Sequence, residues 1–148
     1  MRTTLLFIHI ASAGAWLGGN FTQIVVGPML QRREPNVAAA WFRATVDMGT
    51  RLYTPAGVIL LITGIWQVLT TGYEFEDPFV VIGILAIAVG ITLGVGVFGP
   101  QGSKAAEFAE QGDAGALAAV RKKLMGFGAL DTLVILFAMW AMVKKLGV

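Results

Sequence analysis

Four long apolar runs dominate the sequence, separated by short polar segments. Each run reaches the roughly 17–25 residues that a helix needs to cross the ~30 Å hydrocarbon core of a bilayer. The runs cover residues 3–26, 53–69, 79–98 and 127–143. This pattern predicts an all-α polytopic membrane protein, a four-transmembrane-helix bundle that forms a single domain over residues 1–148.

Local signals place the ends of these helices. Gly27-Pro28 is expected to end the first, since proline disfavours helix in the residue before it. Apolar positions recur every three to four residues from Pro35 to Met48, which predicts a short amphipathic cytoplasmic helix between helices 1 and 2. An ordinary connector with a partly buried face fits that segment equally well. Asp113 has the form of an N-cap, so the fourth helix is expected to extend back to about residue 114.

The first apolar run carries a polar stripe. Its members recur at alternating intervals of four and three, which places them on one face of a helix. Lipid penalises polar groups, so this face is expected to look at protein, water or a bound group. The stripe comprises His9, Ala13, Trp16, Asn20, Gln23 and Gly27.

The inner half of the bundle is expected to hold a polar network around Asp131. A carboxyl group inside a span is costly unless it is paired, protonated or hydrated. Arg51 is the predicted partner, and Asn20 and Gln23 complete the network. An interhelical clamp is favoured over a proton or cation relay, because the spans contain no second carboxylate to pass a proton onward.

The outer half holds the candidates for a metal or cofactor. Imidazole and thioether groups suit Cu(I), and histidine with methionine can ligate haem b. The alternative is a hydrogen-bonded histidine among flexible packing methionines, and it is favoured because the chain has a single histidine. No cofactor is therefore the first expectation, and copper or haem the second. The candidate ligands are His9, Gln67, Met139 and Met142.

Glycine is abundant, with 19 residues, and part of it is patterned. Small residues at intervals of four or seven let helices approach closely. Close packing within this chain is the favoured interpretation. The alternative is that the third apolar helix docks on another membrane subunit or on a second copy. The patterned glycines are Gly14, Gly18, Gly83, Gly90 and Gly94.

Composition and charge narrow the function. The chain is 56% hydrophobic and 14% charged, and it lacks cysteine, which excludes disulfides and thiolate metal sites. No catalytic motif and no basic run interleaved with aromatic residues is present, so neither an enzyme nor nucleic-acid binding is expected.

The distribution of basic residues predicts the topology. Eight basic residues flank the first and third loops against three on the other side, which places both termini on the non-cytoplasmic side. The basic trio Arg121-Lys122-Lys123 is interpreted as a topology anchor rather than a specific lipid site.

Short motifs in the first half of the chain resemble a known group of proteins. They are His9…Trp16-Leu17-Gly18-Gly19 in the first helix, and Tyr53-Thr54-Pro55 with Thr63-Gly64 in the second. This pattern resembles small bacterial integral membrane proteins of the copper-resistance-D-like and uncharacterised DUF type. The resemblance implies a polytopic bacterial inner-membrane protein and a copper association at His9.

Two functions are consistent with the sequence. The first is a non-enzymatic accessory or partner-binding subunit of a larger membrane assembly. The second is a copper- or haem-handling membrane protein that uses His9 as ligand.

Overall fold

The computed structural model describes residues 2–147, which fold into helices joined by short turns. Two of the elements, η1 and η2, are short π-helical segments. The all-α prediction is confirmed. In chain order the elements are α1 (Arg2–Leu30), α2 (Pro35–Met48), η1 (Gly49–Tyr53), α3 (Thr54–Thr71), α4 (Pro78–Leu93), η2 (Gly94–Phe98), α5 (Gly99–Gln111) and α6 (Ala114–Lys144).

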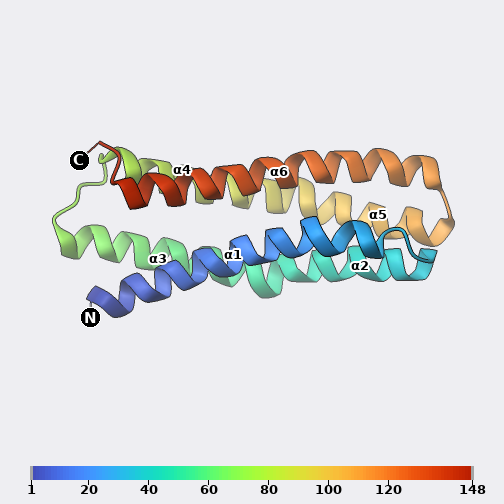
Figure 1. Ribbon diagram of the computed structural model, residues 1–148, viewed down its shortest axis with the longest axis horizontal. Coiled ribbons are helices and arrows are strands. Elements are labelled where there is room, and N and C mark those ends of the chain that lie inside the picture. The colour runs from blue at the N-terminus through green and yellow to red at the C-terminus, as the bar shows by residue number, and fades with distance from the viewer. Residues whose placement is uncertain (1, 148) are drawn as a thin grey trace.

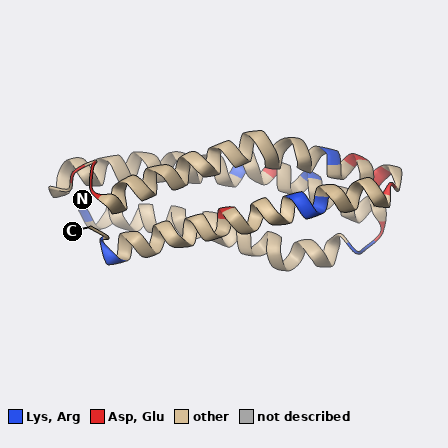
Figure 2. Ribbon diagram, turned by 90° about the horizontal axis from the view of Figure 1, so that it is seen from above, with Lys and Arg blue, Asp and Glu red and all other residues tan. Residues whose placement is uncertain are grey.

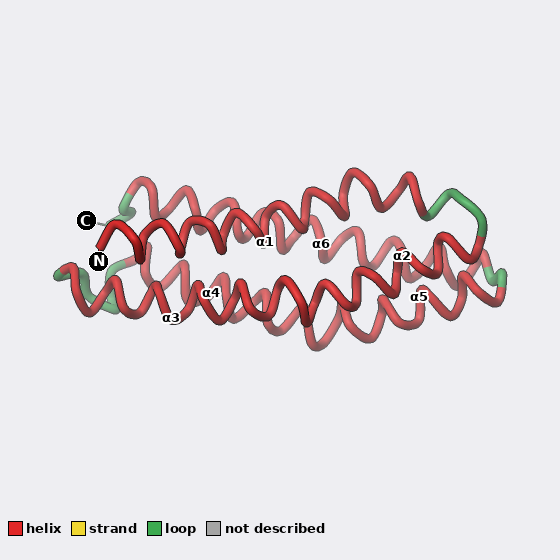
Figure 3. The backbone as a smooth tube through the Cα atoms, turned by 90° about the horizontal axis from the view of Figure 1, so that it is seen from below, coloured by secondary structure: helices red, strands yellow, loops and turns green. Residues whose placement is uncertain are grey.

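These elements form four long helical rods that lie side by side (Figure 1). α2, η1 and α3 make one unbroken helix of 37 residues, and α4, η2 and α5 make another of 34 residues. α1 and α6 are the other two rods, of 29 and 31 residues. The turns lie at the two ends of the bundle (Figure 3), and the start of α1 and the end of α6 lie at the same end as the α3–α4 connection (Figure 1).

Three of the rods are long and apolar enough to cross a membrane: Pro35–Thr71, Pro78–Gln111 and Ala114–Lys144. α1 has sufficient length, with 29 residues, but is not among these three. The structure thus supports three of the four spans that the apolar runs predict. The last helix, α6, begins at Ala114, as its N-cap pattern predicts. The Asp113 side chain accepts a hydrogen bond of 2.9 Å from the backbone N–H of Ala116.

The prediction of a separate amphipathic cytoplasmic helix is not confirmed. α2 has the predicted bounds, but Gly49 keeps a right-handed helical conformation, and the rod continues through η1 into α3. In η1 the N–H of Thr54 bonds to the carbonyl oxygen of Gly49, one residue further back than in an α-helix. This wider turn accommodates Pro55, which lacks an N–H, so the helix continues through the proline.

The same arrangement recurs in the neighbouring rod. Gly94 precedes Pro100 by the same six positions that separate Gly49 from Pro55, and the N–H of Gly99 bonds to the carbonyl oxygen of Gly94. α1 also continues through its proline, Pro28, and ends at Leu30. The prediction that Gly27-Pro28 ends the first helix is therefore wrong by three residues, because a proline in the last turn interrupts little of the hydrogen-bond ladder.

The rods pack in pairs, with α1 on α3, α4 on α6, and α2 on α5. Trp16 lies at the centre of the main core, with small residues from the other three rods around it. A second core joins α2 to α5, where Phe42 packs on Ala105 and Ala106. The small side chains let these helices approach closely.

One end of the bundle forms a charged helical extension, which consists of α2, α5 and residues 114–124 of α6. Rods of 31 to 37 residues measure about 46–56 Å, which exceeds the ~30 Å hydrocarbon core. Figure 2 shows that most charged residues gather at this end. An exposed ion pair between Arg43 and Glu110, with 2.7 Å between nitrogen and oxygen, joins α2 to α5 there.

Candidate functional site

A buried carboxyl group, Asp131, lies at the centre of the bundle on α6. Only 3% of Asp131 is exposed. Its Oδ2 accepts a hydrogen bond of 2.8 Å from Nδ2 of Asn20 and another of 3.1 Å from Nε1 of Trp16. Both donors come from α1, where they lie one turn apart on the same face. The structure therefore brings Asn20 and Asp131 together, as the clamp interpretation requires.

Glycines in two rods make room for the Trp16 ring. A Cβ added at Gly90 of α4 would lie 2.5 Å from Cζ2 of Trp16, and one added at Gly57 of α3 would lie 3.0 Å from Cζ3. Real Cβ atoms essentially never lie within 3.0 Å of another heavy atom, so a side chain at Gly90 would displace the ring, and one at Gly57 would fit only tightly against it. Trp16 thereby contacts α3 and α4 while its indole N–H bonds to α6.

A second polar pair lies beside this centre. The side-chain amide of Gln23 donates a hydrogen bond of 2.8 Å to the hydroxyl of Tyr53. The Tyr53 ring meets Trp16 edge to face, with 5.6 Å between centroids. Because Tyr53 is the last residue of η1, the π-helical turn sets the position of this pair.

The structure does not pair Arg51 with Asp131. Arg51 is exposed, and within residues 2–147 the one ion pair is Arg43 with Glu110. Residues two positions apart on a helix point in different directions, so the inward Tyr53 leaves Arg51 outside. The second carboxyl oxygen of Asp131, Oδ1, is buried and has no hydrogen-bond partner within those residues.

His9 lies nearer the other end of the bundle, against α3. Its Nδ1 is 2.8 Å from Oγ1 of Thr63, whose hydroxyl donates in turn to the carbonyl oxygen of Ile59. Since the hydroxyl hydrogen is used there, Nδ1 of His9 is assigned as the donor and Nε2 carries the lone pair. The ring rests on Gly64, where an added Cβ would lie 3.3 Å from Cε1 of His9.

The other candidate ligands are not brought to His9 by any contact in the described chain. Met142 packs on Gly83 of α4, and Met139 packs against the core around Trp16. The Gln67 side chain donates to the carbonyl oxygen of Thr63, which leaves it one turn from His9's partner. Residues 2–147 also contain no cluster of three histidine, aspartate or glutamate side chains that could hold a metal ion.

The patterned glycines divide into two groups. Gly83 and Gly90 are buried and face Met142 and Trp16 within the bundle, so they cannot line an outward contact face of the third apolar helix. An added Cβ would meet nothing within 4 Å at Gly14, Gly18 or Gly94. The structure thus places two of the five patterned glycines inside the bundle.

The profile of a family described as a predicted integral membrane protein, DUF2269, matches residues 3–146. The chain belongs to the DUF2269 family. No curated protein and no solved structure matches this DUF2269 chain. The match supports the DUF-type part of the resemblance and the assignment as an integral membrane protein, and its description names no metal.

Sequence reasoning missed two hydrogen-bonding groups in the site of this DUF2269 protein: the indole N–H of Trp16, which donates to Asp131, and the hydroxyl of Thr63, which accepts from His9. Trp16 belongs to the polar stripe but is absent from the network predicted around Asp131, although a buried indole N–H needs an acceptor and Asp131 is the carboxylate within the spans. Its spacing from Asn20, one helical turn, was the available signal. Thr63 gave no signal, because a threonine in a span usually bonds to its own helix backbone.

Proposed function

We propose that this protein is a non-enzymatic, four-span protein of the bacterial inner membrane that works as an accessory, partner-binding subunit of a larger assembly. The observation that carries the proposal is the helical extension. Its helices continue the membrane-crossing helices without a break, so they form a rigid surface at a fixed distance from the lipid. A core filled by Trp16 is consistent with a scaffold rather than a conduit.

The charges of the extension suit recognition of a partner. Exposed residues of both signs lie on it, and the Arg43–Glu110 pair fixes two of them in register. Mixed charges at a protein surface give specificity more than affinity. Eight of the eleven basic residues lie at or near this end, which supports its placement in the cytoplasm with both termini outside.

The exposed apolar face of α1 supports the fourth span. Large apolar side chains on α1 are open in the isolated chain, Phe7 with 70% and Ile10 with 55% of their surface exposed. Exposed apolar residues also cover α3, among them Leu69 at 71%. Lipid contact accounts for both faces, because water would penalise apolar patches of this size.

The state of the protein in mild detergent tests the proposal. The wild-type chain, expressed at its natural level, is expected to elute above the monomer mass with a second chain attached. The charge exchange Arg43→Glu/Glu110→Arg keeps the ion pair within the chain but reverses the positions of its two charges. The amount of partner chain that co-purifies should therefore fall at least about fivefold. Arg2→Gln, at the other end, is the control. A wild-type monomer with no co-purifying chain contradicts the proposal.

One observation favours a second candidate, metal handling at His9. A histidine ligand usually donates one ring N–H to a fixed acceptor and offers the other nitrogen to the metal. The Nδ1 contact with Thr63 gives His9 this arrangement. The resemblance to copper-resistance-D-like proteins points the same way, with Met139, Met142 or Gln67 assisting a copper ion or a haem.

Metal analysis and a visible spectrum of the purified protein test this candidate. If it is correct, the wild type carries about one copper ion per chain or shows a haem Soret band, and His9→Ala loses at least about tenfold of either signal. Met29→Leu, an exposed methionine in the last turn of α1, serves as the control. Substoichiometric metal without a Soret band in the wild type contradicts metal handling and leaves the first proposal standing.

A further inference from the structure

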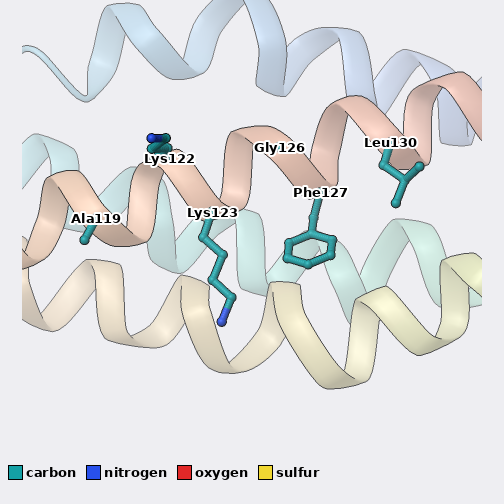
Figure 4. Close-up of a pocket in the computed structure, with 6 residues that line it drawn as sticks. All are labelled: Ala119, Lys122, Lys123, Gly126, Phe127 and Leu130. Carbon is teal, nitrogen blue, oxygen red and sulfur yellow. The ribbon is translucent and has the colours of Figure 1, made fainter.

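Two shallow grooves run along the exposed face of α6 and share one residue, Lys122. The first is lined by Ala119, Lys122, Lys123, Gly126, Phe127 and Leu130, and the second by Ala118, Arg121, Lys122 and Met125. Gly126 leaves the floor of the first groove open, since an added Cβ would meet nothing within 4 Å. Figure 4 shows Lys123 and Phe127 projecting to the same side of α6.

Both grooves are basic at the end nearest the charged helical extension. Lys122 and Lys123 are exposed, and no acidic residue lines either groove. Arg121 adds a third positive charge, and its Nε is buried without a hydrogen-bond partner within residues 2–147. This concentration of donors suits an anion, and phosphate is one of the anions that Lys and Arg bind through charge-assisted hydrogen bonds.

The lower part of the first groove enters the apolar belt. Met125 is 65%, Leu130 45% and Leu133 64% exposed, so lipid chains surround α6 from about one turn below the lysines. From Lys123 to Leu130 the groove descends seven residues, or about 10 Å along the helix. The groove thus combines positive charge at the height of the lipid headgroups with an apolar part below it. A phospholipid has the same arrangement, with a phosphate headgroup above its acyl chains.

We propose that this face of α6 binds an acidic phospholipid of the surrounding bilayer. The amines of Lys122 and Lys123 hold its phosphate groups, and an acyl chain lies over Gly126 between Phe127 and Leu130. The basic trio is then a lipid site as well as a topology anchor. The proposal is independent of the partner-binding role and of the metal candidate.

Native mass spectrometry of the detergent-purified protein, titrated with phosphatidylglycerol or phosphatidylcholine, tests the site. Wild type is expected to prefer phosphatidylglycerol. Since each basic side chain at an anionic lipid contributes a factor of about five, Lys122→Gln/Lys123→Gln should weaken that binding about 30-fold. The control Arg33→Gln/Lys104→Gln removes two exposed charges from the same end and should change it less than about threefold. Equal binding of the two lipids, or an equal loss in the control, overturns the proposal.

A second variant separates the groove from the charge. Gly126→Leu fills the groove and keeps every lysine, and the open space at Gly126 lets the bundle fold as before. Binding of long-chain phosphatidylglycerol is expected to weaken about five- to tenfold, while a dihexanoyl analogue binds the variant and the wild type alike. Undiminished long-chain binding contradicts the groove, and an unchanged tryptophan-fluorescence melting curve confirms that the variant is folded.

Discussion

An Asp131→Ala variant is expected to lose about 3 kcal/mol of unfolding free energy. Alanine leaves the N–H groups of Trp16 and Asn20 buried without an acceptor, and each such group costs about 1–3 kcal/mol. Hydrogen bonds between membrane helices average less, so the lower part of the summed range applies. Asp131→Asn keeps a carbonyl oxygen in place of Oδ2 and removes a carboxyl that no cation in residues 2–147 balances. It is expected to change stability by less than ~1 kcal/mol.

Thermal unfolding in detergent, followed by tryptophan fluorescence, measures this difference. A loss of about 3 kcal/mol corresponds to roughly 6–12 °C in a chain of this size. Asp47→Ala, an exposed aspartate on α2, is the control and should melt like the wild type. If Asp131→Asn melts as early as Asp131→Ala, the formal charge rather than the acceptor oxygen holds α1 to α6, and the clamp interpretation is wrong.

The sequence predicted best those features that local chemistry determines. The bounds of α2 and the cap at Asp113 are set by proline, aspartate and apolar spacing within a few residues. The sequence does not reveal that α2 continues into α3. A proline preceded by a π-helical turn has the same local sequence signals as a helix boundary. The extra residue in that turn also rotates the side chains around the helix axis. Arg51 was expected beside Asp131 because the two lie at similar depth, but Arg51 is exposed and Tyr53 occupies the inner position instead.

Depth in the membrane could be predicted from the sequence, but lateral position could not. Asn20 and Asp131 were expected at similar depth and do meet. His9 and Met142 were also expected at similar depth, yet His9 packs on α3 and Met142 on α4. The choice between these outcomes depends on which rods are neighbours. That choice rests on fits such as Trp16 against Gly57 and Gly90, which no residue spacing encodes.

The second large effect is expected from Gly90→Ala. The new methyl group would meet Cζ2 and Cη2 of Trp16 at 2.5 and 2.7 Å. The ring cannot retreat, because Gly57 bounds it on α3 and its N–H is bonded to Asp131. Overpacking of this kind costs about 1–3 kcal/mol, and the strained hydrogen bond adds to that cost. We therefore expect a loss of about 2–3 kcal/mol, seen as a lower melting temperature and a shifted Trp16 emission.

Gly94→Ala, one turn further along the same rod, is the matched control. Its Cβ would meet nothing within 4 Å, and alanine favours helix over glycine by up to about 1 kcal/mol. This variant should therefore melt at or above the wild-type temperature. The pair also separates the two roles considered for the glycines of the third apolar helix. If Gly90→Ala weakened self-association in detergent and left the melting temperature unchanged, Gly90 would serve an interface between chains. A lower melting temperature with an unchanged mass of the purified particle shows that Gly90 makes room for the Trp16 ring within one chain.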